Sequence, residues 1–405
     1  MNITLMHFSA PPVVGGVETV LERQALQLVR SGHKVRILAG SGETWDARIP
    51  VDVLTRLNIR YPQNLKMKAS LDAGGIPEEF PGYVQQIQTD LVRALGGTKV
   101  VIAHNIASLN KNLTLTVALY NLWQSGQISR LVLWHHDLAW TTQRYQEELH
   151  PGWPWDLLRT AWPGARQVTV SEARRLELAN LFHISPQEIV VIPAGLDMAD
   201  FLGLQVRTVN LIDSLELTQA APILLAPVRV TRRKNLELAF STLSALRKDL
   251  PRAVLVVTGP VGLQNPANLE YLEHLHKLRS DLLLEDAIHL LAEIAPEGLP
   301  AAVLSDFYRI ADALFLPSKE EGFGNPILEA GLSRLPIFCS DLPALRDLAG
   351  HYATYFAVDD SPKYIAKEIV KQLKTDPVYR LRVRLRQEYT WQSIYHRLIA
   401  PLLDG

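Results

Sequence analysis

Short apolar runs alternate with longer amphipathic segments along the whole chain, and this alternation limits the fold more than any other feature. The apolar runs are mostly continuous stretches of Val, Ile and Leu, as in parallel strands that are covered on both faces. The segments between them repeat apolar residues at helical spacing, as in residues 17–31. This strand–helix–strand order predicts right-handed crossovers and a doubly wound α/β sheet. The first expected strands are residues 2–8, 34–40, 99–103, 131–134, 167–170 and 189–192.

The alternation starts a second time after about residue 200. Residues 202–221 lie between the two series, have no strong apolar period and are expected to form a linker. Two large domains also fit a length of 405 residues, at roughly 100–200 residues per domain. The predicted fold is therefore α/β, with two Rossmann-like domains at residues 1–200 and 201–387 that face each other across a cleft. The second series of strands is expected at residues 222–230, 253–259, 288–291, 313–317 and 336–340.

The charge balance excludes several classes of binding protein. The chain has 41 Lys and Arg against 42 Asp and Glu, a formal net charge of -1, so bulk charge does not favour nucleic acid or anionic membranes. Its one cysteine, Cys339, cannot form an intrachain disulfide, which fits a reducing compartment. No apolar run approaches the ~18–20 residues needed to span a bilayer, and residues 1–8 do not resemble a signal peptide. We therefore expect a cytoplasmic protein that does not bind nucleic acid.

A glycine-rich loop follows the expected strand at residues 313–317. Gly322 and Gly324 leave backbone N–H groups unobstructed, and Pro326 is at a favoured early position of the helix that follows. Free amides beside a helix N-terminus form a site for a phosphate group. The loop therefore predicts an anion site at the end of this strand.

Two carboxylates eight residues apart flank the same loop. Glu321 is positioned to accept hydrogen bonds from hydroxyl groups, and Glu329, one turn into the helix, to accept two from a ribose diol. Either carboxylate alone also fits a tight turn whose acidic residue favours the helix dipole. Both together around a Gly-Phe-Gly sequence favour binding of a nucleotide compound.

A cluster of cations follows the expected strand at residues 222–230. Arg229, Arg232, Arg233 and Lys234 lie where the chain leaves that strand, and such side chains grip phosphate oxygens. A solvated basic turn is the alternative. A second basic run, Arg380 to Arg386, is expected to be solvated surface.

These segments together resemble the retaining glycosyltransferases of family 4, the glycosyl transferases group 1, which have the GT-B fold. The pair Glu321 and Glu329 resembles the E-x7-E motif of that family, and Arg229 and Lys234 resemble its diphosphate-binding Arg and Lys. Gly15-Gly16-Val17-Glu18 resembles its first-strand loop. The resemblance spans almost the whole chain and follows the order of the family's segments. It also implies that a terminal helix at about residues 388–405 returns to the first domain.

The resemblance implies transfer of a hexose, glucose or mannose, from a GDP-, UDP- or ADP-sugar to an acceptor hydroxyl, with retention at the anomeric carbon. The acceptor would be a saccharide, a lipid-linked saccharide or a small molecule. Peripheral contact with a membrane stays open as an alternative that the sequence does not otherwise support. The residues implied in catalysis are His136, Glu321, Arg229 and Lys234. The residues implied in donor binding are Gly15, Gly16, Arg229, Lys234, Glu293, Gly322, Phe323, Gly324, Asn325 and Glu329.

His136 follows the expected strand at residues 131–134, where the family has a His that contacts the donor sugar, and His135 is the second choice. Several other polar or aromatic residues come after strands of the first domain, and capping or core packing explains each of them equally well. These candidates for the acceptor side are His104, Asn105, His135, Asp137, Trp140 and Ser171.

Two negative observations bear on cofactors. No two Asp residues are separated by a single residue, and no His and Cys residues cluster at metal-ligand spacing. We therefore expect no metal and no cofactor, with the leaving group held by Arg229, Lys234 and loop amides. Three alternatives remain: a catalytically silent relative that binds a nucleotide sugar or a protein partner, a GT-B epimerase or inverting relative with Asp137 as base, and a dehydrogenase. The dehydrogenase would need a G-x-G-x-x-G spacing, which Gly15-Gly16 lacks.

Overall fold

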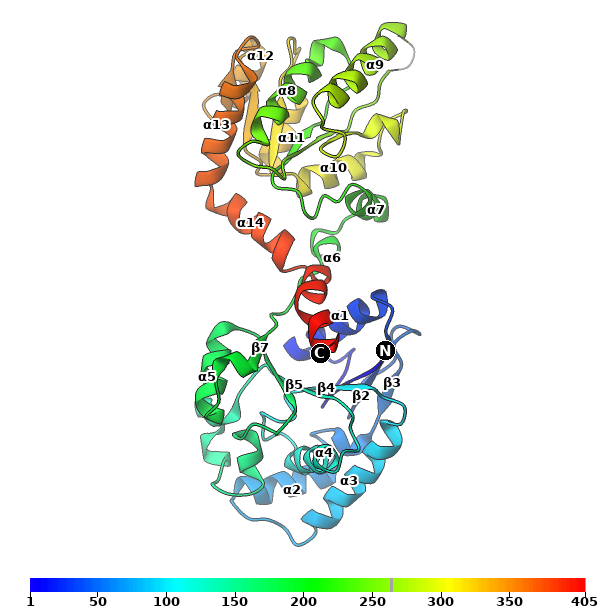
Figure 1. Cartoon of the computed structure of the whole chain (residues 1–405), viewed down its shortest axis with the longest axis vertical. Helices are drawn as coiled ribbons and strands as arrows, with labels where there is room; N and C mark the ends of the chain where they lie inside the picture. The colour runs from blue at the N-terminus through cyan, green and yellow to red at the C-terminus, as the bar shows by residue number, and fades with distance from the viewer. Residues whose placement is uncertain (263–264, 405) are drawn as a thin grey trace. The chain divides into compact units, whose positions relative to one another are not determined.

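The computed structural model describes residues 1–262 and 265–404 and divides the chain into two compact units (Figure 1). Unit 1 comprises Met1–Leu196 and Tyr389–Gly405, and unit 2 comprises Asp197–Glu388. The predicted domain boundaries lay a few residues away, at 200 and 387. The C-terminal segment is therefore a part of unit 1.

Unit 1 is built on a seven-stranded parallel sheet in the order β3-β2-β1-β4-β5-β6-β7. Its strands are β1 (Asn2–His7), β2 (Lys34–Ala39), β3 (Val51–Val53), β4 (Val100–His104), β5 (Leu131–His135), β6 (Arg166–Thr169) and β7 (Ile189–Val191). Its helices are α1 (Gly16–Arg30), α2 (Pro62–Asp72), α3 (Phe80–Ala94), α4 (Leu113–Gln124), α5 (Glu172–Phe182), α15 (Trp391–Ile394) and α16 (Ala400–Asp404).

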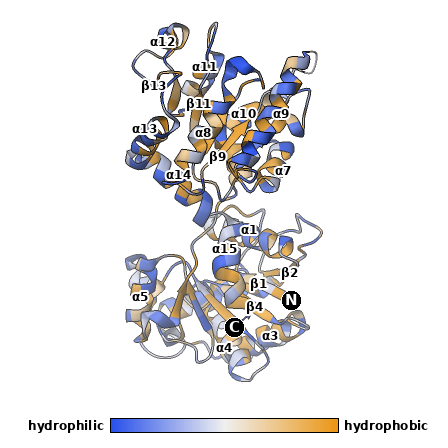
Figure 2. Ribbon diagram, turned by 45° about the horizontal axis from the view of Figure 1, so that its top comes forward, coloured by the Kyte–Doolittle hydropathy of each residue, from blue (hydrophilic) through white to orange (hydrophobic). Residues whose placement is uncertain are grey.

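Successive side chains of the central strands of unit 1 enter two different cores. On β4, Val101 and Ala103 pack into one cluster, and Val100 and Ile102 pack into the other. Both faces of the sheet are covered, which is why these strands are continuous apolar runs rather than alternating ones. The same strands are orange in Figure 2.

The C-terminal segment completes one of these cores. Trp391, Ile394 and Ile399 belong to the cluster that also contains residues of β1 and α1. Arg130 donates to the carbonyl oxygens of Leu402 and Leu403, at 3.2 and 2.5 Å. The segment is thus held by both apolar burial and hydrogen bonds.

Unit 2 has a six-stranded parallel sheet in the order β10-β9-β8-β11-β12-β13. Its strands are β8 (Ile223–Ala226), β9 (Val254–Val257), β10 (Ile288–Leu290), β11 (Ala313–Leu316), β12 (Ile337–Ser340) and β13 (Thr354–Phe356). Its helices are α6 (Met198–Leu202), α7 (Val206–Ser214), α8 (Leu236–Leu246), α9 (Pro266–Asp281), α10 (Ala301–Ile310), α11 (Asn325–Leu332), α12 (Pro343–Ala349), α13 (Pro362–Thr375) and α14 (Pro377–Glu388). None of the helices in the described residues is long and apolar enough to cross a membrane.

Two sequence-based predictions about unit 2 are wrong. The expected linker at residues 202–221 contains α7, and its Thr208 is buried and donates to Asp306 Oδ2 at 2.6 Å. The linker was predicted because α7 is too short to show a clear apolar period. The basic run was expected to be solvated, but Arg386 is buried and donates to both carboxylate oxygens of Asp312, at 3.1 and 2.7 Å.

Candidate active site

The candidate site in unit 2 lies at the point where the strand order reverses. The chain runs outward from β8 through β9 to β10, and in the other direction from β11 through β12 to β13. Ligands of open α/β sheets bind beyond the carboxyl ends of the strands at such a point. The segments there are the β8 loop (residues 227–235) and the β11 loop (residues 317–324).

Backbone contacts join these two loops to each other and to the end of β9. The amide of Lys319 donates to Arg233 O at 2.8 Å, and the amide of Val230 donates to Pro260 O at 3.1 Å. A Cβ atom at Gly259 would lie 2.2 Å from Val228 O, so only glycine admits the β8 loop at this distance. The loops therefore form one packed assembly.

Lys234 and Glu321 form a buried ion pair between the two loops. Lys234 Nζ donates to Glu321 Oε1, and Ser318 Oγ donates to the same oxygen at 2.7 Å. The side chains of Lys234 and Glu321 are each 9% exposed. The ammonium group has further protons for an anionic ligand, and Glu321 Oε2 is available to accept from a hydroxyl group.

The β11 loop ends at the N-terminus of α11. Gly324 has φ +100°, and a Cβ atom there would lie 2.6 Å from Leu345 Cδ2. The backbone conformation thus favours glycine, and a Cβ atom there would also push against this methyl group of α12. Gly322, Phe323 and Asn325 are exposed beside the first turn of α11, whose free N–H groups attract anions.

Glu329, on α11, has a partner that the sequence did not indicate. Its exposed carboxylate accepts a hydrogen bond at Oε2 from the hydroxyl group of Tyr308, a buried residue of α10. Burial and the neighbouring carboxylate raise the pKa of Tyr308, so its hydroxyl keeps the proton that it donates. Tyr308 therefore fixes one oxygen of Glu329.

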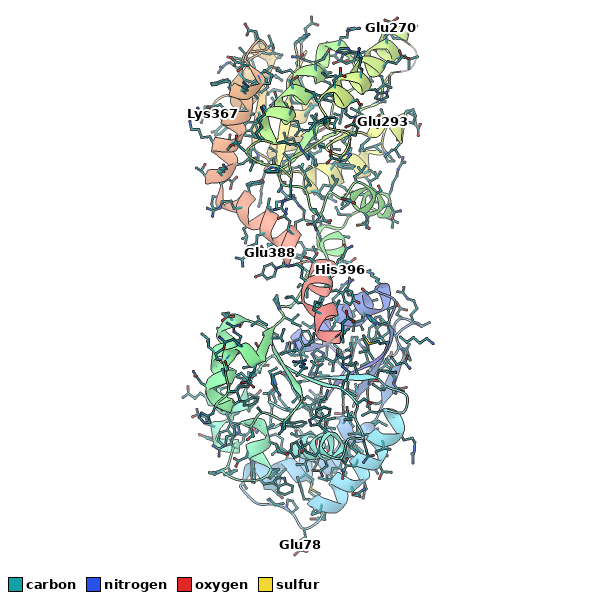
Figure 3. The ribbon with its side chains drawn as sticks, in the orientation of Figure 1. Glu78, Glu270, Glu293, Lys367, Glu388 and His396 are labelled. Atoms are coloured by element: carbon teal, nitrogen blue, oxygen red, sulfur yellow. The ribbon has the colours of Figure 1, made fainter. Side chains whose placement is uncertain are left out.

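The other two candidates of unit 2 stand apart from the Lys234–Glu321 pair. Arg229 is exposed on the β8 loop, so its guanidinium group is accessible to a ligand. Glu293, labelled in Figure 3, follows the edge strand β10 and pairs with Arg279 and His276, each at 2.8 Å. The structure thus does not bring Glu293 into contact with Lys234 or Glu321.

Unit 1 has a corresponding reversal of strand order between β1 and β4, and three histidines gather there. His7 ends β1, His104 ends β4 and His136 follows β5; we call these three the histidine cluster. His7 Nδ1 lies 3.0 Å from His104 O, and His104 Nδ1 lies 3.0 Å from His136 Nε2. Burial lowers the pKa of all three, that of His136 to about 3. The cluster is therefore neutral at physiological pH.

Neighbouring side chains hold the backbone of His136 and lie close to the ring of His7. Asn105, in the left-handed conformation at φ 57°, accepts at Oδ1 from the amides of His136 and Asp137, at 2.8 and 3.2 Å. Ser9 Oγ donates to Glu18 Oε1 at 2.5 Å, and that oxygen lies 3.8 Å from His7 Nε2. Glu18 belongs to the first turn of α1, which begins after Gly15.

Three candidates for the acceptor side do not join the histidine cluster. His135 is buried with Nε2 2.8 Å from Gln167 Oε1 and packs edge-on against Phe182. Trp140 donates to Trp155 O at 3.2 Å. Ser171 caps α5 by accepting from the Arg174 amide at 3.2 Å. These contacts are the helix capping and core packing that the sequence left open as alternatives to a role in binding.

Comparison with known proteins adds the family. The Glycosyltransferase Family 4 model matches residues 14–200, and the Glycosyl transferases group 1 model matches residues 210–389. The chain belongs to the family 4 glycosyltransferases. Its two parallel doubly wound sheets are those of the GT-B fold, as predicted, and as a family 4 glycosyltransferase it is an enzyme that transfers a sugar to an acceptor.

Several relatives match most of this glycosyltransferase. It is 28% identical to the mannosylglucosylglycerate synthase of Petrotoga mobilis, over 95% of this chain and 96% of that protein. It is 24% identical to the mannosylglucosylglycerate synthase of Thermotoga maritima, over 83% of this chain and 80% of that protein. It is also 24% identical to the MMP alpha-(1->4)-mannosyltransferase of Mycolicibacterium hassiacum, over 86% and 83%.

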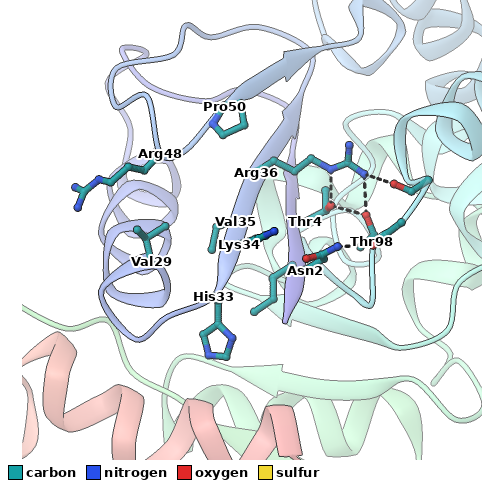
Figure 4. A pocket seen from close by; sticks show the side chains of 13 residues that line it. Asn2, Thr4, Val29, His33, Lys34, Val35, Arg36, Arg48, Pro50 and Thr98 are labelled. Carbon is teal, nitrogen blue, oxygen red and sulfur yellow. Dashed lines mark hydrogen bonds between the residues drawn. The ribbon is translucent and has the colours of Figure 1, made fainter.

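A cavity of about 440 Å³ in this glycosyltransferase lies at the other end of the unit 1 strands, by the amino ends of β1 and β2 (Figure 4). Arg36 lines it, but its guanidinium group donates to Thr4 and Thr98 at 3.1 and 2.9 Å. Arg48 is paired with Asp46 at 2.6 Å. The two arginines are therefore already engaged, and the cavity lies at the amino ends of the strands rather than at the carboxyl ends, where ligands of such sheets bind.

Sequence reasoning missed His7, Ser9, Ser318 and Tyr308. His7 had a signal, because it ends the first strand just as His104 ends the fourth, and the carboxyl ends of parallel strands share one edge. Ser318 directly follows the expected strand 313–317. Tyr308 had no local signal, since its role depends on the packing of α10 beside α11.

Proposed function

We propose that this glycosyltransferase moves a hexose from a nucleoside-diphosphate sugar to an acceptor hydroxyl, with retention of anomeric configuration and without a metal ion. The observation that carries the proposal is the buried Lys234–Glu321 ion pair at the strand-order reversal of unit 2. It joins a fixed positive charge to a carboxylate of the β11 loop, and the next two residues of that loop, Gly322 and Phe323, are exposed. A diphosphate next to a sugar needs this combination.

In this proposal unit 2 binds the donor. Lys234, the exposed Arg229 and the amides around Gly322 hold the diphosphate, while Glu329 accepts from the ribose hydroxyls. Glu321 accepts from a hydroxyl of the transferred sugar. Cleavage of the glycosyl–phosphate bond builds negative charge on the diphosphate, and preorganised donors stabilise that charge. In this proposal Lys234 and the loop amides are those donors, so the mechanism needs no metal ion.

The names of the relatives favour mannose over glucose as the transferred sugar, and a small glycoside as the acceptor. In unit 1 we assign the contacts with the sugar and the acceptor to His136 and to the residues that follow β1. These include Gly16, where nothing lies within 4 Å of the position that a Cβ atom would take. In this proposal the imidazole of His136 contacts an oxygen of a sugar.

The proposal is tested with the purified chain, GDP-, UDP- and ADP-linked mannose and glucose, and a panel of sugar and glycerate glucoside acceptors, in excess EDTA. Release of nucleoside diphosphate gives the rate, and the proton coupling of the product's anomeric carbon gives its configuration. We expect transfer that EDTA does not change and a product with the donor's configuration. Inversion would refute the retaining mechanism, and donor binding without product would favour the catalytically silent alternative.

Lys234→Ala should lower kcat by roughly 10²–10³-fold, the loss expected for one preorganised donor. Lys248→Ala is the matched control, because Lys248 is exposed just beyond the far end of α8. Thermal unfolding of both variants checks that they fold. A folded Lys234→Ala protein with the kcat of the control would refute the assignment.

A further inference from the structure

The histidine cluster contains a hydrogen bond whose direction can be worked out. His104 Nδ1 and His136 Nε2 lie 3.0 Å apart, with the two rings nearly parallel at 28°. Since both rings are neutral, each carries a single N–H, and one of these two nitrogens donates while the other accepts. Two tautomer assignments satisfy this one contact.

The second nitrogen of His104 decides between them. His104 is fully buried, and within the described residues Nε2 has no hydrogen-bond partner. Its ring stacks on Trp134 with an interplanar angle of 26°, so an N–H at Nε2 would run roughly along the face of that ring rather than toward it. A buried N–H without an acceptor is rarer than an acceptor left unfilled. The proton of His104 therefore belongs on Nδ1, which donates to His136 Nε2.

This assignment determines which edge of His136 carries a proton. Its Nε2 accepts from His104, so its single proton is on Nδ1. The part of the chain that the structure describes makes no hydrogen bond to His136 Nδ1, and the residue is partly exposed. Asn105 holds the backbone of the same residue by accepting from its amide at 2.8 Å. Both the ring and the backbone are thus fixed.

We propose that His104 is a positioning residue that holds His136 in the Nδ1–H tautomer, so that His136 donates a hydrogen bond to an oxygen of the substrate and does not act as a base. The tautomer follows from unit 1 alone. The contact with substrate rests on the proposed function, in which His136 faces a hydroxyl or ring oxygen of a sugar. His7 supports the arrangement, since its Nδ1 donates to the carbonyl oxygen of His104 at 3.0 Å.

The tautomer is tested by two-bond proton–nitrogen NMR of the full chain with ¹⁵N-labelled histidine at about pH 7. His136→Asn and His104→Phe assign the signals by their disappearance. We expect Nδ1–H patterns for both His104 and His136 in the unmodified chain, and loss of that pattern for His136 in His104→Phe. His135→Asn, a buried histidine outside the cluster, should leave both signals in place. An Nε2–H pattern for His136 in the unmodified chain would overturn the inference, whether or not the variants fold.

The direction of the substrate contact is tested by two amide substitutions. The amide nitrogen of asparagine lies near the position of Nδ1, and that of glutamine near the position of Nε2. His136→Asn should therefore keep several-fold more kcat/KM than His136→Gln, and His104→Phe should lose about threefold to tenfold, the effect of one neutral hydrogen bond. Greater activity in His136→Gln would overturn the substrate contact. A protein with the expected tautomer but no transfer would instead refute the proposed function.

Discussion

Replacing Gly259 by alanine should lower the turnover of this glycosyltransferase without unfolding it. The added Cβ atom would lie 2.2 Å from Val228 O and 2.6 Å from Arg229 N. Both are backbone atoms of the β8 loop, so no side-chain rotation relieves the clash. Ordinary contact begins near 3.4 Å, and the loop must therefore move by roughly 1 Å.

The same loop carries Arg229 and Lys234, so the displacement reaches the proposed diphosphate site. A misplacement of about 1 Å in a binding group costs roughly 10²-fold in rate. The strain should also lower the free energy of unfolding by about 1–3 kcal/mol, as for other overpacked sites. We expect kcat to fall by about a hundredfold while unit 2 still unfolds cooperatively.

The assay is nucleotide release under saturating donor and acceptor, together with thermal unfolding. Gly331→Ala is the matched control, because nothing lies within 4 Å of its Cβ position on α11, and alanine favours a helix over glycine. The control should keep the turnover of the unmodified chain. A folded Gly259→Ala protein with unchanged kcat and KM would refute the claim that this contact positions the β8 loop.

Three further changes test other contacts. Tyr308→Phe should weaken nucleotide binding by a few-fold in calorimetry, because Glu329 loses one fixed hydrogen bond; unchanged affinity would contradict this. Asp312→Ala should lower the free energy of unfolding by about 3–5 kcal/mol in denaturant titration, since Arg386 is left buried without its partner; a loss below about 1 kcal/mol would contradict it. His135 is buried, which lowers its pKa to about 4. In the unfolded chain its pKa is near 6.5, so the unfolded state takes up a proton as the pH falls and the folded state does not. The free energy of unfolding should therefore fall by about 2 kcal/mol between pH 7 and 5 through this residue. His135→Asn should remove this contribution to the pH dependence.

Much of the fold was predictable because the strands are buried on both faces. The continuous apolar runs at 99–103 and 131–134 became β4 and β5 with shifts of one residue at their ends. Two strands were missed, β3 and β13. Each has three residues and lies at the edge of its sheet. β3 contains Asp52 and no buried residue, and β13 has only Phe356 buried, so neither shows a buried apolar run. The equally short edge strands β7 and β10 were predicted, because the apolar runs at 189–192 and 288–291 mark them.

The candidate site was predictable where its parts are local. Glu321, Gly324 and Glu329 lie on one loop and one helix, so their spacing alone placed them near each other. The partners of these groups were not predictable in the same way. Tyr308 comes from α10, and Gly259 from the end of β9; both act through contacts between elements that are distant along the chain.

The amino-acid sequence by itself determined the family, the order of the buried strands and most of the helices, and the loops that follow β8 and β11. These depend on periodicity and on motifs within a few residues, which are local properties. Only the tertiary structure decided that Arg386 is buried in an ion pair while Arg229 is exposed, although both are arginines in basic runs. It also decided that His136 and not His135 joins His7 and His104. The exposure and partners of a side chain depend on what the rest of the fold brings to it, and that is a property of the packed chain.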